Sequence, residues 1–332
     1  TVDIDEQWAI RINNRYFDLP LLGEVVWQPC RQHIVDADLV IVEQANRLLF
    51  NYPLKFLWRN DKRKVAFWGH GTNFQSSDPN SLDNRLKRYL AKQVDWWFAY
   101  TKASIRHLEM ATFPTEKVTV VQNCIDTSCL KEAVERTSAE ELDTLRQRLG
   151  LRSNRVGLYC GGLYADKQID FLLRACDELK EKTPDFECII IGDGPDSEKV
   201  RIAATSRNWL HYMGPIFGDE RIPYFLLARV LLIPGALGLV VIDSFVSGVP
   251  LVTTNNGKHG PEIAYLENCV NGFMTANNVS DYVNEVTSIL IDDNYWQDLR
   301  KGCSLSAEKY SLENMVENFA TGIRRCLALN EQ

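Results

Sequence analysis

The chain has 332 residues, of which 45% are hydrophobic and 24% are charged. This is a globular composition, and the length suffices for two α/β domains of ordinary size, each with its own core. A formal net charge of −7 argues against a general nucleic-acid binder.

The cysteines and the hydrophobic runs further limit the class of protein and its cellular compartment. There are nine cysteines, an odd number, and several stand inside apolar runs. This pattern predicts buried thiols in a reducing compartment, and without a C-x2-C pair we expect no zinc site. The sequence has no apolar run of about twenty residues and no signal peptide. We therefore expect a cytoplasmic protein without a membrane-spanning segment.

In the first half of the chain, apolar runs of strand length alternate with polar segments of helix length. The predicted strands cover residues 38–43, 64–70, 96–101 and 118–123. This spacing predicts parallel strands with helical crossovers, in an N-terminal domain of residues 1–150. Asp36-Ala37-Asp38 has the form of a metal-binding Asp-x-Asp, but it directly precedes a strand, and we interpret it as a helix-to-strand turn.

Two basic stretches raise the question of a membrane surface. They are Arg59 to Lys64 and Asn84 to Phe98, the second with the pair Trp96-Trp97. One interpretation is an interfacial amphipathic helix, which would place the protein at the inner face of the membrane as a peripheral protein. The other is an ordinary helix that packs its leucines and Trp97 inward.

A histidine ends the second of these predicted strands. His70 stands between Gly69 and Gly71 and is followed by Thr72 and Asn73. Because ligands bind at the carboxyl edge of a parallel sheet, this loop is a candidate for function. The alternative is a histidine that hydrogen-bonds a turn. His33, His107 and His211 lack glycine neighbours and are interpreted as structural or surface residues.

The second half repeats the alternation. A helix over 138–149 and a linker over 150–154 lead to predicted strands near 156–160, 187–192, 209–213, 229–233, 250–254 and 272–274. We assign 151–310 to a C-terminal domain. A last helix is predicted over 312–327, within a C-terminal segment of residues 311–332.

Three glycine loops follow strands of this second half. The first carries Gly161, Gly162 and, at the expected start of a helix, Lys167. Glycines allow backbone amides to approach a phosphate closely, a helix start adds positive potential, and lysine supplies a mobile cation for a diphosphate. The alternative is a tight turn with a solvated lysine. The second loop, Ile189 to Pro195, is by itself only a turn after a buried strand.

The third loop leads into a helix. Gly235, Gly238 and Leu239 precede the run VVIDSFV, which places Asp243 in the first turns of that helix. A carboxylate there is suited to accept both hydroxyls of a ribose. The alternative is an acidic residue favoured by the helix dipole.

These segments together resemble the donor half of a GT-B glycosyltransferase, in the large retaining family 4 of sugar transferases. The resemblance rests on Gly161-Gly162-Leu163 with Lys167, Ile191 to Pro195, Pro234 to Pro250, Pro261-Glu262, and upstream on Val118 to Thr127 and Phe67 to Asn73. It covers about residues 65 to 275. The fold it implies is α/β of GT-B type: two Rossmann-like domains with parallel sheets facing a central cleft, and a last helix that crosses back to the first domain.

The resemblance also implies an activity. We expect transfer of a sugar from a UDP- or GDP-sugar to a saccharide or lipid-linked saccharide, with retention, in bacterial surface polysaccharide or lipopolysaccharide assembly. No metal or other cofactor is expected. The implied catalytic residues are His70, Lys167 and Asp243, with Gly71, Thr72 and Asn73 on the acceptor side. The implied donor-binding residues are Gly161, Gly162, Gly192, Gly194, Pro195, Gly214, Gly235, Gly238, Leu239, Val240, His259 and Glu262.

The chain departs from the family pattern at several positions. Gly162 stands where an arginine is usual, Gly235 where the first glutamate of E-x7-E is usual, and Asp243 replaces the second. These departures leave open a non-catalytic nucleotide-sugar-binding subunit, and a nucleotide-sugar epimerase of the same fold is a further alternative. The family's opening strand, glycine loop and helix are not recognised in this sequence, so the N-terminal domain is expected to lack that unit.

Overall fold

The structure is a computed structural model and describes residues 8–19, 23–56, 63–71, 89, 92–256 and 258–328. The chain divides into two compact units, unit 1 with Thr1–Gln122 and Val316–Gln332, and unit 2 with Asn123–Met315. This division differs from the boundary at residue 150 that we expected from the sequence. Residues 123–150 belong to unit 2 because the helices α4 (Ser128–Arg136) and α5 (Ala139–Leu149) pack on α8 (Ile222–Leu227).

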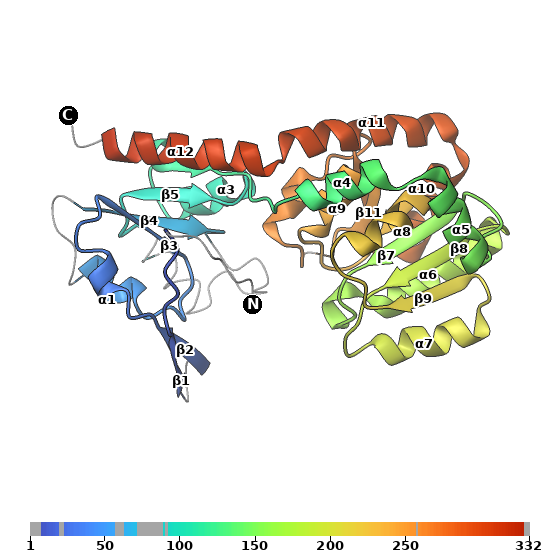
Figure 1. Ribbon diagram of the computed structural model, residues 1–332, viewed down its shortest axis with the longest axis horizontal. Coiled ribbons are helices and arrows are strands. Elements are labelled where there is room, and N and C mark those ends of the chain that lie inside the picture. The colour runs from blue at the N-terminus through green and yellow to red at the C-terminus, as the bar shows by residue number, and fades with distance from the viewer. Residues whose placement is uncertain are drawn as a thin grey trace. The chain divides into compact units, whose positions relative to one another are not determined.

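Unit 1 is built on a parallel sheet in the strand order β3-β4-β5-β6 (Figure 1). The strands are β3 (Leu39–Glu43), β4 (Lys64–Gly69), β5 (Trp96–Ala99) and β6 (Val118–Val120), as predicted. Among the described residues, η1 (Arg31–His33) precedes β3, and α1 (Asn51–Phe56), α3 (Ala103–Met110) and η2 (Thr115–Lys117) lie between the strands. Asp36 and Asp38 lie in the turn before β3, also as predicted.

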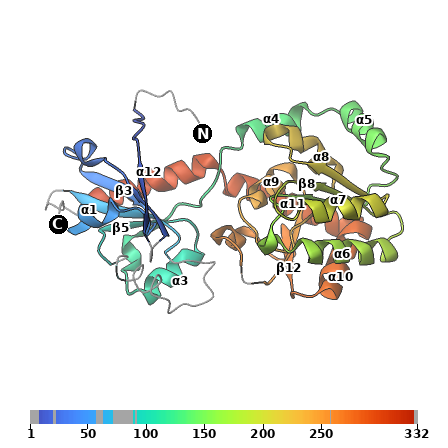
Figure 2. The same cartoon turned by 90° about the horizontal axis from the view of Figure 1, so that it is seen from below.

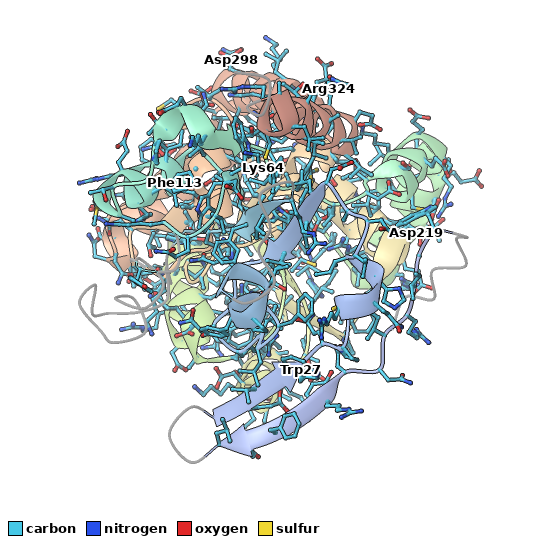
Figure 3. All side chains as sticks on the ribbon, turned by 90° about the vertical axis from the view of Figure 1, so that its left-hand side faces the viewer. Trp27, Lys64, Phe113, Asp219, Asp298 and Arg324 are labelled. Carbon is cyan, nitrogen blue, oxygen red and sulfur yellow. The ribbon has the colours of Figure 1, made fainter. Side chains whose placement is uncertain are left out.

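An antiparallel hairpin precedes this sheet and was not predicted. It pairs β1 (Arg15–Leu19) with β2 (Gly23–Trp27), and Trp27, labelled in Figure 3, lies opposite Arg15. Every residue of β1 is exposed, and only Val25 and Val26 of β2 are buried. Neither strand therefore has the apolar run by which the other strands were recognised.

The tryptophan pair considered for a membrane surface lies in the core of unit 1. Trp96 and Trp97 belong to β5 and are 1% and 0% exposed. The Trp97 ring packs edge-on against Phe67 and Phe113, and the Trp96 indole N–H donates to the Thr119 hydroxyl over 2.9 Å. The strand predicted over 96–101 is confirmed and the helix interpretation of the same rings is wrong, because a strand between two parallel neighbours is covered on both faces. Most of the two basic stretches lies outside the described residues.

The final helix, α12 (Leu312–Ala328), joins unit 1 from Val316 onward. Phe319 stacks on Phe98 with ring centroids 4.9 Å apart and meets Trp68 edge-on. The Arg325 guanidinium lies 5.2 Å from the centre of the Trp96 ring. The C-terminal helix thus completes one face of the unit 1 sheet.

Unit 2 contains a parallel sheet in the order β12-β11-β10-β7-β8-β9. The strands are β7 (Val156–Cys160), β8 (Glu187–Ile191), β9 (Leu210–Gly214), β10 (Val230–Leu232), β11 (Leu251–Thr254) and β12 (Gly272–Thr275), where the sequence predicted them. β7 and β8 are buried along their whole length, as continuous apolar runs between helices should be.

Helices cover both faces of this sheet. Figure 2 shows α6 and α10 on one side and α4, α5 and α8 on the other. The remaining helical elements of unit 2 are η3 (Ala165–Lys167), α6 (Ile169–Lys182), α7 (Ser197–Ser206), η4 (Gly218–Arg221), α9 (Val240–Ser247), η5 (Pro261–Tyr265), α10 (Val279–Ile291) and α11 (Asp293–Lys309).

Local sequence signals fix several helix ends. Ser138 caps α5 by accepting from the Glu141 amide, and Gly150 ends that helix with a φ of 69°. Asn278 and Asp292 cap α10 and α11 in the same manner as Ser138. These caps satisfy backbone groups that a helix end leaves unpaired.

The strand order places a switch point beside β7. The chain passes from β7 outward to β8 and β9, and then returns to β10 on the other side of β7. The loops after β7 and β10 therefore lead away in opposite directions at the carboxyl edge of the sheet. In open α/β sheets this is where ligands bind.

Candidate functional site

The loops after β7 and β8 are packed on each other by backbone contacts. The Gly161 amide donates to the Ile191 carbonyl, and the Leu163 amide donates to the Asp193 carbonyl, over 3.0 and 2.9 Å. A Cβ on Gly192 would lie 1.9 Å from the Gly161 oxygen. The same addition to Gly194, which precedes Pro195, would lie 2.3 Å from the Leu163 oxygen. Both glycines are needed for this close approach.

Gly162 has a local explanation in the ring of Tyr164. A Cβ at position 162 would lie 2.7 Å from Cε1 of that ring. The Gly162 carbonyl in turn accepts from the Tyr159 hydroxyl over 2.6 Å. The Tyr164 ring therefore occupies the direction that an arginine side chain at position 162 would take.

The loop after β10 is joined to the loop that carries Lys167. The Ala236 amide donates to the Asp166 carbonyl over 2.8 Å, and the Lys167 ammonium donates to the Ala236 carbonyl over 2.5 Å. A Cβ on Gly235 would lie 2.3 Å from the Lys167 carbonyl carbon, so a glutamate does not fit there. Burial lowers the pKa of Lys167, and Asp166 acts in the opposite direction. A desolvated cation thus lies at the switch point.

The start of α9 lies directly beside this cation. The helix begins at Val240, and the amides of Val241 and Ile242 donate to the carbonyls of Gly238 and Leu239. Among the described residues, no acceptor is bonded to the amides of Gly238, Leu239 and Val240. A Cβ on Gly238 would meet nothing within 4 Å, so the backbone is open to solvent there. Free amides at a helix start form an anion-binding position.

His259 lies under the same loop, with both ring nitrogens engaged. It is 7% exposed; Nδ1 accepts from the Leu237 amide over 3.1 Å, and Nε2 lies 2.7 Å from the Thr254 carbonyl, to which it donates. Burial lowers its pKa, with Lys167 acting in the same direction. The imidazole is therefore neutral and supports the loop, whereas the resemblance implied a contact with the donor.

Glu262 and Gly214 also have partners inside unit 2. One carboxylate oxygen of Glu262 accepts from the Asn123 side-chain amide over 2.9 Å, and Glu262 is 5% exposed. Gly214 ends β9, has a φ of 71°, and its carbonyl accepts from the Gly192 amide over 2.9 Å. Gly214 thereby connects β9 to the same set of loops.

Asp243 is buried and paired with an arginine that we did not predict. It is 3% exposed, and its two oxygens accept from Nη1 and Nη2 of Arg221 over 2.7 and 3.0 Å. Burial raises the pKa of Asp243 to about 6, while Arg221 acts to lower it. From the resemblance we expected these oxygens to accept ribose hydroxyls, and in the structure the guanidinium occupies both. No motif around Arg221 signalled this contact.

The predicted acceptor-side residues belong to unit 1. His70 follows β4, and its ring lies edge-on to Tyr100 with centroids 4.3 Å apart. The Gly71 amide donates to Gln44 Oε1 over 3.1 Å, and a φ of 78° explains the glycine. Thr72 and Asn73 lie outside the described residues. The predicted site residues thus fall at the carboxyl edges of two separate sheets.

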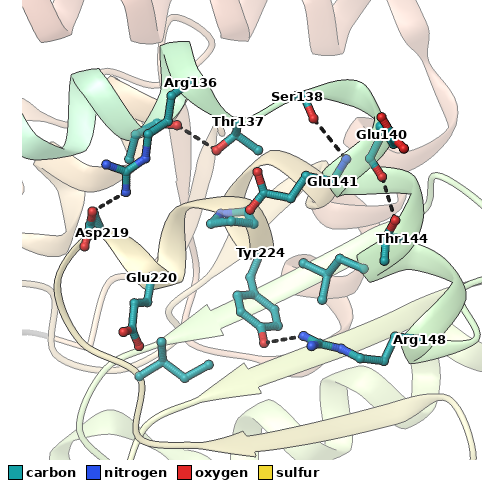
Figure 4. A pocket seen from close by; sticks show the side chains of 14 residues that line it. Arg136, Thr137, Ser138, Glu140, Glu141, Thr144, Arg148, Asp219, Glu220 and Tyr224 are labelled. Atoms are coloured by element: carbon teal, nitrogen blue, oxygen red, sulfur yellow. Dashed lines mark hydrogen bonds and ion pairs between the residues drawn. The ribbon is translucent and has the colours of Figure 1, made fainter.

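A cavity of about 720 Å³ lies in unit 2 between α4 and α5 on one side and η4 and α8 on the other (Figure 4). Arg136 forms an ion pair with Asp219 there, and Arg148 donates to the Tyr224 hydroxyl over 3.3 Å. None of the predicted site residues lines it. Asp219 belongs to η4, so the Arg136 pair also anchors the turn that carries Arg221.

The described residues contain neither a group of potential metal ligands nor a membrane-spanning helix. Within 8–19, 23–56, 63–71, 89, 92–256 and 258–328, no three His, Cys, Asp or Glu side chains are grouped as metal ligands would be. Over the same residues, no helix has the length and hydropathy needed to cross a bilayer.

Comparison with known proteins identifies the second half of the chain. Residues 154–292 match the family described as Glycosyl transferases group 1. The chain is 26% identical over 192 residues to a 2-deoxystreptamine N-acetyl-D-glucosaminyltransferase of Niallia circulans, covering 56% of this chain and 48% of the relative. It is 26% identical over 279 residues to the alpha-D-kanosaminyltransferase of Streptomyces kanamyceticus, covering 78% of this chain and 70% of the relative. The chain thus spans about half the length of the first relative.

The fold is also found among solved structures. The Anabaena protein HepE, in complex with UDP, has a TM-score of 0.69 at 19% identity, covering 88% of this chain and 80% of HepE. This likeness and the parallel sheets of both units confirm the predicted fold class. The chain therefore has the GT-B fold, and its residues 154–292 are similar to Glycosyl transferases group 1.

Proposed function

We propose that the chain is a retaining glycosyltransferase that moves a sugar from a nucleoside-diphosphate sugar to a hydroxyl of a saccharide or lipid-linked saccharide. The observation that carries the proposal is the hydrogen bond from Lys167 to the Ala236 carbonyl, in the loop that leads into the open start of α9. Both lie at the switch point of a parallel sheet, inside the segment that matches group 1 glycosyl transferases. The relatives are named for sugar transfer, and HepE was solved with UDP.

In this proposal the site acts on the leaving diphosphate. Negative charge grows on that group as the bond from the anomeric carbon to the phosphate oxygen breaks. The Lys167 ammonium and the amides of Gly238, Leu239 and Val240 stabilise it electrostatically. These groups supply the positive charge, so the proposed reaction needs no divalent metal. The Lys167 side chain is already held by the Ala236 carbonyl and needs little reorganisation when the donor binds.

We assign the acceptor to unit 1. His70 directly follows β4 at the carboxyl edge of its sheet, and Gly71 comes next. Thr72 and Asn73, which follow in the sequence, complete the proposed acceptor side. The acceptor hydroxyl would form its bond to the anomeric carbon on the face that the diphosphate leaves, which retains the configuration. In line with the sequence resemblance, we place the activity in the assembly of bacterial surface polysaccharide or lipopolysaccharide, at the cytoplasmic face of the membrane.

The glycine replacements do not favour a non-catalytic subunit. The Tyr164 ring explains Gly162, and the backbone of Asp166 and Lys167 explains Gly235. Each is a packing requirement of the loops that hold Lys167 in place. The replacements are therefore compatible with an active donor site.

The test is donor turnover by the whole chain without added metal. UDP- and GDP-sugars are each incubated with saccharide and lipid-linked acceptors, and nucleotide release and the anomeric configuration of the product are measured, the latter by NMR. We expect acceptor-dependent release from one donor and a product with the donor's configuration. An inverted product would overturn retention, and an epimerised sugar nucleotide would indicate an epimerase. Nucleotide binding without release from any pair would indicate a non-catalytic subunit.

A further inference from the structure

Arg221 is held in one orientation by three hydrogen bonds. Its Nε donates to the Gly218 carbonyl over 2.9 Å, and Nη1 and Nη2 donate to the two oxygens of Asp243 over 2.7 and 3.0 Å. The Arg221 side chain is 20% exposed, and that of Asp243 is 4% exposed. A planar guanidinium fixed in this way is pre-organised for a further contact.

The guanidinium lies at the switch point described above. Asp243 stands in the first turn of α9, the helix whose free amides face the proposed diphosphate position. On the other side, Arg221 lies close enough to Cys160, the last residue of β7, to oppose the rise that burial causes in the pKa of its thiol. Arg221 therefore lies between the end of β7 and the start of α9. The loop that carries Lys167 follows this strand in the sequence.

Not all N–H groups of the Arg221 guanidinium are used within the protein. A guanidinium carries five N–H donors, and Gly218 and Asp243 take three of them. The other two donate to no acceptor among the described residues. The exposed fifth of the side chain and its remaining N–H capacity are suited to an oxygen of an anion.

A second cation beside Lys167 would add a charge-assisted contact to a diphosphate. Position 162 is a glycine and supplies no cation. Lys258 is nearby, but it is 59% exposed and forms an ion pair with Asp166 over 2.7 Å. Arg221 is the better fixed of the two, because its partner is buried and bidentate.

We propose that Arg221 is a donor-binding residue whose guanidinium donates to a phosphate oxygen of the nucleoside diphosphate, and that Asp243 positions it rather than accepting ribose hydroxyls. This inference rests on the proposed function and names a second anion contact within the same site. Two ion pairs tie the turn η4 to neighbouring helices, the Arg136–Asp219 pair near its start and the Arg221–Asp243 pair at its end.

The experiment measures the dissociation constant of whichever nucleotide, UDP or GDP, the wild-type protein binds, together with its 2′-deoxy form. The variants are Arg221→Gln, Arg221→Lys, Asp243→Asn and the double variant Arg221→Gln/Asp243→Asn. We expect Arg221→Gln to weaken binding about tenfold or more, as for loss of one charge-assisted hydrogen bond. Arg221→Lys keeps the positive charge but lacks the paired N–H groups of the guanidinium. Its affinity for the nucleotide should lie between those of the wild type and Arg221→Gln. The double variant should bind no more weakly than Arg221→Gln, because Asp243 acts through Arg221.

The double variant is also the folding control. Removing Arg221 alone leaves a buried carboxylate without its partner, which is destabilising, whereas the double variant leaves no such charge. If Arg221→Gln does not fold, the result is read from Arg221→Lys and the double variant. Thermal unfolding of each protein identifies the folded variants.

Two results would overturn the inference while leaving the proposed function intact. The first is wild-type affinity in the double variant alongside weakened binding in Lys167→Ala. The second concerns the 2′-deoxy nucleotide. If the wild type binds it more weakly than the ordinary nucleotide and Asp243→Asn binds both equally, Asp243 contacts the ribose. By contrast, a wild-type protein that binds no nucleoside diphosphate would contradict the proposed function itself, and this inference with it.

Discussion

At the scale of single residues, the sequence identified which side chains lie at the switch point but not what they contact. Asp243 was predicted in the first turns of a helix as a carboxylate for ribose hydroxyls, but it is buried, and a buried carboxylate needs a partner within the protein. The partner, Arg221, is 22 positions away in a turn with no motif of its own. Similarly, Gly162 was interpreted as a missing cation. The position of the Tyr164 ring, which explains that glycine, depends on backbone geometry that spacing does not reveal.

The buried pair predicts an unusual pH dependence of stability. Burial raises the pKa of Asp243 from 3.8 to about 6, so between these values the folded protein binds this proton more tightly than the unfolded chain does. The stability contributed by protonated Asp243 is therefore present below about pH 4 and is lost as the pH rises through about 6. The loss is on the order of 3 kcal/mol.

Urea unfolding of the wild type and of Asp243→Asn between pH 4 and 7 measures this contribution. The asparagine cannot titrate, so the free energy of unfolding of the wild type minus that of the variant should decrease as pH rises across the window. A difference that is constant, or that increases with pH, would show that Arg221 outweighs burial. Other carboxylates titrate in both proteins and cancel in the difference.

At the scale of elements, the buried parallel strands were predictable and the hairpin was not. The strands β3 to β12 appear as apolar runs bounded by turn residues, because a strand covered on both faces has to be apolar throughout. The hairpin of β1 and β2 is exposed over most of its residues and shows no such run. Two competing predictions covered Trp96 and Trp97, a strand over 96–101 and a helix over 84–98, and the structure places both residues in the strand β5.

Two glycines of the loop between β10 and α9 should respond differently to alanine. Gly235→Ala drives a methyl group into the Asp166 and Lys167 backbone at 2.3 to 2.5 Å and should lower stability by roughly 1–3 kcal/mol or more. Gly238→Ala meets nothing within 4 Å and should leave stability within about 0.5 kcal/mol of the wild type. The methyl group of Gly238→Ala should nevertheless weaken nucleotide binding, because it stands between the α9 amides and the phosphate.

Thermal unfolding and nucleotide titration of both variants test this distinction. Gly238→Ala with normal unfolding and weakened binding would support a ligand at the α9 start. Unchanged nucleotide affinity in a folded Gly238→Ala would exclude close approach of the phosphate at this position. Gly235→Ala with wild-type stability would contradict the packing of the two loops.

At the scale of the whole molecule, the chain has the GT-B fold with two units, and strand spacing together with the family resemblance predicted two α/β domains. The unit boundary was misplaced because α4 and α5 look like the last helices of a first domain, while their apolar faces pack on unit 2. Leu130 and Ala133 of α4, for example, form a buried cluster with Ile222 of α8. A helix sequence shows which face is apolar but not which domain covers it.

The most direct test is a calorimetric titration of the full chain, without metal, with UDP, GDP and their sugar conjugates, in parallel with Lys167→Ala. Lys167 contacts a backbone carbonyl and no buried carboxylate, so the variant should remain folded, which thermal unfolding checks. We predict that one nucleotide binds the wild type and that Lys167→Ala weakens it about tenfold or more, as for loss of a charged contact. Failure of the folded wild-type protein to bind any of these nucleotides, or equal affinity in the variant, would contradict a donor site at the β7–β10 switch point.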